Sequence, residues 1–265
     1  MRRSTIFWGS IFLILGFLVL LENLGIIDIN VWELVWPLFL IALGLWVLLG
    51  ALAGRRGGEV EHAVVQLEGA SQAKIRFNHG AGRLRVSGMA APNTLLEGDF
   101  SGGIDVTRRQ EGDTLDVTLS MPSKYFPDIP WPWGANNLDW IIKINDQTPV
   151  SLNLNTGAAE SKMDFSTTQV KDIRLKTGAS STELVLPSNA GQVYVKVEAG
   201  VASVKIQVPQ GVAARIRDKS GLTTLNIDRN RFPRQKGVFV SPDYDTAQNK
   251  VEIDVQTGVG SIDIR

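Results

Sequence analysis

The 265-residue sequence contains no cysteine and only two histidines, His62 and His79. Without cysteine the chain cannot form a disulfide, a thiolate metal site or a cysteine nucleophile. Two histidines are too few for a histidine-based zinc cage. His79 stands beside Gly80 with no partner motif, so we predict that it is a turn residue rather than a ligand or a base.

An excess of charge is also lacking, because 27 Lys and Arg balance 27 Asp and Glu. Proteins that bind nucleic acid carry a basic excess, so we expect no nucleic-acid partner. The sequence has no phosphate-binding loop, dinucleotide fingerprint or serine nucleophile elbow. Its acidic residues alternate with apolar ones, as on the solvated face of a strand. We therefore expect no catalytic, cofactor-binding or metal-binding residue, and no enzymatic activity.

What the sequence does contain is two long uncharged runs near its N-terminus, residues 5–21 and 34–53. A helix needs about 20 apolar residues to cross a bilayer. The alternative for the first run is a signal peptide, but no cleavage site with small residues follows it. We predict that residues 1–54 form a two-span transmembrane helical hairpin in the lipid bilayer.

The charges around these runs predict an orientation. The loop between them is acidic and has no Lys or Arg, whereas arginines flank the pair on both sides. Because basic flanks stay in the cytoplasm, the N-terminus and the C-terminal domain are both predicted to be cytoplasmic. Trp and Arg also favour the membrane interface, and the expected interface residues are Trp8, Trp32, Trp36, Trp46, Arg55 and Arg56.

Residues 55–58 are predicted to be a linker, and residues 59–265 a domain built from a recurring phrase. In this phrase a glycine follows a short polar segment and precedes an alternating apolar strand. The marker glycines 157, 178, 200 and 221 are separated by steps of 21, 22 and 21 residues, and a fixed period of this size is typical of a solenoid. The predicted corner glycines are Gly80, Gly102, Gly157, Gly178, Gly200, Gly221 and Gly258.

Each step holds two short strands in which apolar residues alternate with charged or polar ones, so one face of each strand is buried. We predict an all-β domain, a two-sheet β-solenoid in which each turn of about 21–22 residues stacks on the previous one. The runner-up is an ordinary antiparallel β-sandwich. The glycines would sit at corners because φ is positive there or because the backbone crowds its neighbour.

Two segments interrupt the period, residues 122–149 and 229–250, and are predicted to be inserts. The first is rich in Pro and aromatic residues, including Trp140. Exposed Trp anchors partners, so Phe126, Trp131 and Trp133 are candidate partner-binding residues. The alternative is that these rings cover the open end of the coil.

Several motifs resemble those of a known bacterial group. Residues 20–25 (LLENLG), 36–38 (WPL) and 44–46 (GLW) are similar to the LiaI–LiaF-like transmembrane region. Residues 77–84 (FNHGAGRL) and 154–158 (LNTGA) are similar to the toast-rack and LiaF-like C-terminal domains. The resemblance implies a non-enzymatic membrane protein of the cell-envelope stress response, in a group whose LiaF-like members restrain a sensor kinase.

We therefore expect a membrane-anchored regulator or sensor whose partner is another membrane protein, such as a sensor kinase. Two alternatives remain open. One is a structural scaffold that self-associates through the ends of its coil. The other is a surface adhesin, which requires the β domain to lie outside the cell.

Overall fold

The computed structural model describes residues 36, 37, 39–41, 43, 44, 60–122 and 138–265. The described residues belong to an N-terminal unit within residues 1–54 and a β unit from Val60 onward. The linker and most of the predicted hairpin lie outside the described residues. So do the predicted site residues Trp8, Trp32, Trp46, Arg55, Arg56, Phe126, Trp131 and Trp133.

The described residues of the N-terminal unit, from Trp36 to Gly44, are helical. Their large apolar side chains are exposed, with Trp36 at 62%, Phe39 at 55% and Ile41 at 65%. Among the residues that the structure describes, no helix reaches the length and apolarity needed to cross a membrane. The predicted count of two spans stays a prediction.

The β unit confirms the prediction of an all-β domain, and its described residues form a 14-stranded sheet. Its strands are β1 (Val60–Gln66), β2 (Gln72–Ser87), β3 (Thr94–Ser101), β4 (Asp105–Glu111), β5 (Thr114–Ser120), β6 (Asp139–Ile144), β7 (Val150–Asp164), β8 (Val170–Val185), β9 (Gln192–Gln207), β10 (Ala213–Asp218), β11 (Leu222–Ile227), β12 (Arg234–Gln235), β13 (Val238–Val240) and β14 (Lys250–Ile264).

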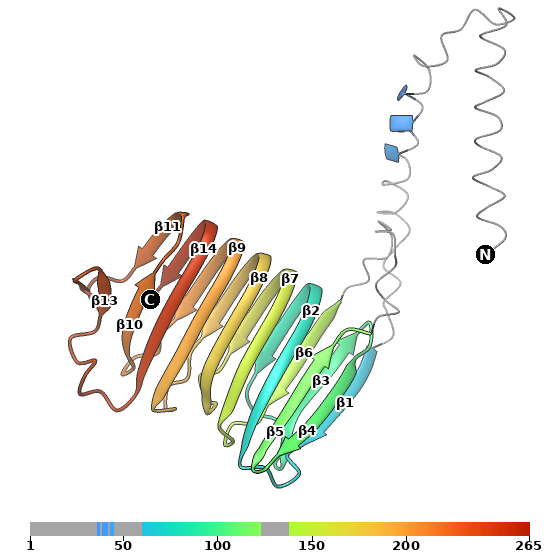
Figure 1. Ribbon diagram of the computed structural model, residues 1–265, viewed down its shortest axis with the longest axis horizontal. Helices are drawn as coiled ribbons and strands as arrows, with labels where there is room; N and C mark the ends of the chain where they lie inside the picture. Colours follow the sequence, from blue (N-terminus) through green and yellow to red (C-terminus); the bar gives the residue numbers. More distant parts are fainter. Residues whose placement is uncertain (1–35, 38, 42, 45–59, 123–137) are drawn as a thin grey trace, which may run out of the picture. The chain divides into compact units, whose positions relative to one another are not determined.

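Five strands of 15 or 16 residues form the body of the unit: β2, β7, β8, β9 and β14. They lie side by side in parallel, and each bends near its middle (Figure 1). The pairing continues on both sides of the bend, as between β8 and β9. Each predicted turn of two short strands is therefore one bent strand, which we call a rung.

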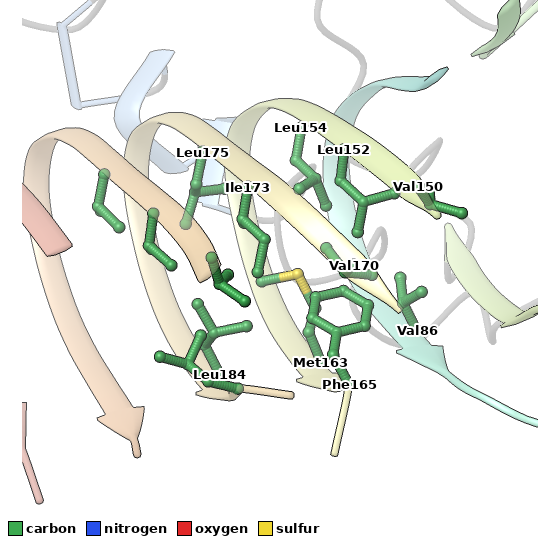
Figure 2. Close-up of a cluster of buried hydrophobic side chains, with 14 of the residues drawn as sticks. Val86, Val150, Leu152, Leu154, Met163, Phe165, Val170, Ile173, Leu175 and Leu184 are labelled. Carbon is green, nitrogen blue, oxygen red and sulfur yellow. The ribbon is translucent and has the colours of Figure 1, made fainter. Parts of the chain in front are cut away.

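The two halves of a rung enclose the core between them. In β8, Ile173 and Leu175 come from the first half and Leu184 from the second, and all three are buried (Figure 2). Arg174 alternates with the first two and is exposed. Because neighbouring rungs stack in register, Ile173 lies beside Val195 of β9, and equivalent apolar residues form continuous rows through the core.

The order of the last rungs differs from the prediction. β10 and β11 together form a rung that is interrupted at residues 219–221, and β14 lies between this rung and β9. The prediction that every turn stacks on the previous one is wrong here. The uninterrupted β14 pairs along its whole length on both sides, whereas an interrupted rung is better placed at the end of the stack.

At the other end, antiparallel strands close the coil. β5 and β6 pair with the two halves of β2, β4 pairs with β5, β3 with β6 and β1 with β3. Gly102 lies in the link between β3 and β4 with φ at 89°. It lies at a corner where the chain passes from the side of β6 to the side of β5, and its positive φ distinguishes it from the other predicted corner glycines.

The predicted inserts, residues 122–149 and 229–250, both include residues that belong to strands of the sheet. Residues 139–144 are strand β6, in which Trp140 is fully buried and packs edge-on against Phe100 at 5.1 Å between ring centroids. The second insert contains the short strands β12 and β13 and contributes Phe232 to the core, and Lys250 already belongs to β14.

Candidate functional site

The bends of the rungs place glycines in one column. A Cβ atom built on Gly157 would lie 2.4 Å from the carbonyl oxygen of Gly80, and one on Gly178 would lie 3.0 Å from that of Gly157. The same relation links Gly200 to Gly178 at 2.8 Å. The column continues with Gly258 beside Gly200 and Gly221 beside Gly258.

Crowding by the neighbouring rung explains these glycines. None of the column glycines has a positive φ, so other residues could adopt their backbone conformation. A side chain at Gly178 or Gly200 would instead meet the carbonyl oxygen of the adjacent rung. Of the two reasons that the sequence offered for a corner glycine, the structure supports close backbone approach.

A groove of about 1190 Å³ runs along this column across the rungs. It is lined on most rungs by the column position and by the two residues before it. Its floor includes the buried residues His79, Thr156 and Thr177. The groove begins near Ser120 of β5 and extends to Gly221, so it spans nearly the whole stack of rungs.

Polar side chains that lie two residues before each glycine form one flank of the groove. The Asn155 side-chain amide donates a hydrogen bond to Asn78 Oδ1 at 3.0 Å, and the Asn78 amide donates to Ser120 Oγ at 3.2 Å. Lys176 and Glu198 continue the row as an ion pair at 3.2 Å. Hydrogen bonds thus join the row across β5, β2 and β7, and a separate ion pair joins it across β8 and β9.

The carboxylate of Glu198 stays ionised in this row. Hydrogen bonds from Lys196 and then from Lys176 lower its pKa below the ordinary value. Lys219 lines the far end of the groove. The flank therefore presents amides at one end and fixed charges of both signs at the other.

Apolar side chains follow the glycines by one residue and form a second row. Strand register aligns them from rung to rung. Their size and exposure are greatest near the C-terminal end, where Val201 is exposed by 60%, Val259 by 49% and Leu222 by 82%. The row consists of Ala81, Ala158, Ala179, Val201, Val259 and Leu222. The bends thus carry a polar row, a glycine column and an apolar row.

The prediction that His79 is a turn residue is wrong, because it lies inside strand β2 and is buried with 1% exposure. Its Nε2 lies 3.1 Å from the carbonyl oxygen of Leu138. A carbonyl oxygen only accepts hydrogen bonds, so Nε2 carries the proton and Nδ1 is the unprotonated atom. Nδ1 is buried without a hydrogen-bond partner among the described residues, and the ring packs against Trp140 at 5.0 Å.

Burial lowers the pKa of His79, and this effect outweighs the opposing influence of the Leu138 carbonyl and of Asp139. The unfolded chain therefore takes up a proton near pH 6.5, while the folded chain does not until lower pH. We expect the free energy of unfolding to fall as the pH drops below about 6.5, and the His79→Gln variant to lose part of this slope. Urea unfolding of both proteins at several pH values between 5 and 8 measures it. Equal slopes would contradict the prediction.

Sequence reasoning missed the apolar row and the burial of His79. The signal for the row was present, because each of its members follows a marker glycine by one position. Its significance depends on in-register stacking, which alternation within one strand does not reveal. Trp36, the described member of the predicted interface residues, is helical and exposed.

Two family comparisons match most of the chain. The family described as the N-terminal domain of toast_rack, DUF2154, matches residues 55–207. The LiaI–LiaF-like transmembrane region matches residues 6–48. No curated protein matches.

A solved structure with a TM-score above 0.5 shares the fold of the β unit. A candidate cell adhesion protein from Clostridium sporogenes ATCC 15579 is 22% identical, with a TM-score of 0.71 over 78% of this chain and 98% of its own. Candidate adhesins from Bacteroides fragilis NCTC 9343 and Parabacteroides merdae ATCC 43184 are 11% and 12% identical. Each covers 78% of this chain at a TM-score of 0.27, over 97% and 81% of its own length respectively.

The stack of bent parallel rungs fits the match over residues 55–207, which spans most of the β unit. The resemblance seen in the sequence motifs is thus confirmed for both parts of the chain. The chain belongs to the family of the toast_rack N-terminal domain, and a LiaI–LiaF-like transmembrane region precedes that domain.

Proposed function

We propose that the protein is a non-enzymatic, membrane-anchored interaction protein that acts as a regulator or sensor in the bacterial cell-envelope stress response. The groove along the bends receives its partner. The single observation that carries this proposal is the continuity of the groove, which reaches from Ser120 to Gly221 with the polar row in its lining. The apolar row follows one residue after the glycine column. The matches to the toast_rack and LiaI–LiaF-like families support the envelope-stress role.

The rows indicate the chemistry of the partner. One flank offers the amides of Asn78 and Asn155 and the charges of Lys176 and Glu198. On the other side the apolar row offers Val201 and its neighbours. An extended polypeptide with alternating polar and apolar side chains satisfies both, and a segment of a sensor kinase or another membrane protein is the partner that we propose.

Recovery of the partner from membranes tests the groove. Ala179 is exposed beside the column, so Ala179→Trp fills space at the bend without disturbing the core. The matched control is Arg174→Trp, an exposed position on the same strand outside the groove lining. After in vivo cross-linking of the full-length protein, we expect Ala179→Trp to lower recovery of the main partner at least tenfold and Arg174→Trp to leave it unchanged. Equal recovery from both variants would exclude the apolar row beside the glycine column as part of the binding surface.

The anchor is proposed to be a two-span hairpin with both the N-terminus and the β unit in the cytoplasm. The flanking arginines and the exposed apolar side chains of the described helical residues support it. A reporter that is active only in the cytoplasm, fused after Arg265, should be active. An external β unit would overturn this orientation and favour the adhesin alternative. The Clostridium sporogenes protein is described as a cell adhesion protein, which agrees with that alternative.

A further inference from the structure

The end of the coil formed by β11 has an open edge. β11 pairs with β14 on one side and with no other strand of the described residues (Figure 1). Its first residue, Leu222, is 82% exposed. An open strand edge presents unpaired N–H and C=O groups to any strand that approaches it.

β11 differs from the other strands at the edges of the described sheet in having no charged residue. Charges at an edge discourage pairing with other chains, and Lys or Arg is a common protection. The other edges carry such residues, namely Glu61 and His62 in β1, Asp105, Arg108, Arg109 and Glu111 in β4, and Arg234 in β12. The sequence of β11, LTTLNI, contains none, so this edge is unprotected.

The direction of the backbone groups in β11 follows from one hydrogen bond. The N–H of Asp228 donates to the carbonyl oxygen of Ile264 at 3.0 Å, so this position faces β14. Backbone groups alternate sides along a strand, so those of Leu225 and Ile227 and the carbonyl oxygen of Thr223 point to the open edge. The N–H of Thr223 donates to the carbonyl oxygen of Gly221 at 3.1 Å. The side chains of the same three residues face the inside of the coil and are less exposed than their neighbours.

The interior of the coil is also incomplete at this end. Leu225 packs against the core but remains partly exposed. Beside it is a cavity of about 170 Å³ lined by the apolar Leu225, Ile227 and Phe239 and by Gly237 and the charged Asp218, Arg229 and Arg234. A further strand on β11 would extend the sheet and cover Leu225 at the same time.

We propose that this strand is β11 of a second copy, paired antiparallel about a two-fold axis at Leu225. Antiparallel neighbours must both point their backbone groups towards each other or both away. Only registers that place a residue facing the open edge opposite another residue facing the open edge meet this condition. Pairing Leu225 with Leu225 of the second copy, and Thr223 with its Ile227, engages the backbone groups of Leu225 and Ile227 and the carbonyl oxygen of Thr223, whose N–H already donates to Gly221. The two leucines then meet across the axis and continue the core.

This register makes a second pairing between exposed residues. Thr224 lies opposite Asn226 of the other copy, and the side chains at both positions point outward. It is a pair without mutual hydrogen bonds, for which the Cα atoms are about 4.5 Å apart. That distance lies within the range that disulfides span, which is about 4.4–6.8 Å. Because the native sequence has no cysteine, cysteines introduced at these two positions are the only thiols in the chain.

The test is oxidative cross-linking of full-length protein in native membranes. The double variant Thr224→Cys with Asn226→Cys should convert most of the chain to a disulfide-linked dimer. Each single variant should stay at the background level, because identical positions are not opposite each other. The single variants expressed together in one cell should again give the dimer. The matched control, Thr107→Cys with Arg109→Cys on the edge strand β4, should remain monomeric.

A monomeric double variant with the thermal unfolding transition of the parent protein would overturn the proposal. Equal cross-linking by Thr224→Cys alone would overturn the register. Cross-links to a different protein would show that β11 binds a foreign strand. The inference is independent of the proposed function, because the groove variant Ala179→Trp leaves the dimer cross-link intact even if it changes partner recovery.

Discussion

Ending the chain after Asn249 should abolish the cooperative unfolding transition of the β unit. This change removes β14, which is the second-to-last rung of the stack and pairs with β9 on one side and with β10 and β11 on the other. Its inward side chains are fully buried, and they are Val251, Ile253, Val255, Ile262 and Ile264. Each contributes roughly 1.5–3 kcal/mol, so their sum rivals the 5–15 kcal/mol stability of a typical domain.

Circular dichroism during heating, with the full-length protein in detergent as reference, measures this effect. The control lacks only Arg265, an exposed residue directly after β14, and should unfold close to the reference temperature. A synthetic peptide of residues 250–265 should restore the transition when it is added to the shortened protein, because it refills the space between β9 and β10. A shortened protein that keeps a sharp transition would show that β10 and β11 can move against β9.

Gly260→Ala should destabilise the β unit more than any other single glycine substitution at the bends. A Cβ atom there would lie 1.8 Å from the carbonyl oxygen of Ala202, and the φ of 149° is itself unfavourable for alanine. The strand must therefore separate from β9 at this point. Backbone strain alone costs about 1–3 kcal/mol, and the lost pairing adds to it, so we expect a loss of at least about 3 kcal/mol.

A graded series makes this prediction sharper. The same Cβ would lie 2.4 Å from a neighbouring oxygen at Gly157 and 3.0 Å at Gly178. Urea unfolding should give losses in the order Gly260, Gly157, Gly178, with Ala179→Ser as a near-neutral control. If all three alanine variants unfolded at the urea concentration of the control, the rungs would be more loosely stacked than the register implies.

The period of the sequence predicted the rungs because local chemistry repeats in each of them. Alternation around Ile173 and Leu175 specifies which side of the strand is buried, and the glycine after Thr177 specifies the bend. The position of β14 was not predictable from alternation. Val251 and Ile253 of β14 carry the same pattern as Ala214 and Ile216 of β10. Alternation therefore does not show which of the two strands pairs with β9. The interruption at residues 219–221 was the available clue.

The groove could be predicted only in part. Its glycine column was visible in the sequence, but its flanks depend on residues that stacking brings together from distant positions, such as Asn78 and Asn155. Gly102 was predicted to be a corner of the same repeat because the link between β3 and β4 also reads as a glycine before an alternating strand. Its positive φ, which the column glycines lack, distinguishes the two cases only in three dimensions.

The placement of β14 also bears on how the protein is made. A ribosome delivers β10 and β11 before β14, at about 5–20 residues per second. During that interval the nascent domain must keep a space open between two rungs that are already synthesised. Closure of the sheet therefore waits for a segment that is translated later. Chains released before β14 is made would leave the inward side chains of β9 and β10 uncovered and open to chaperones and proteases.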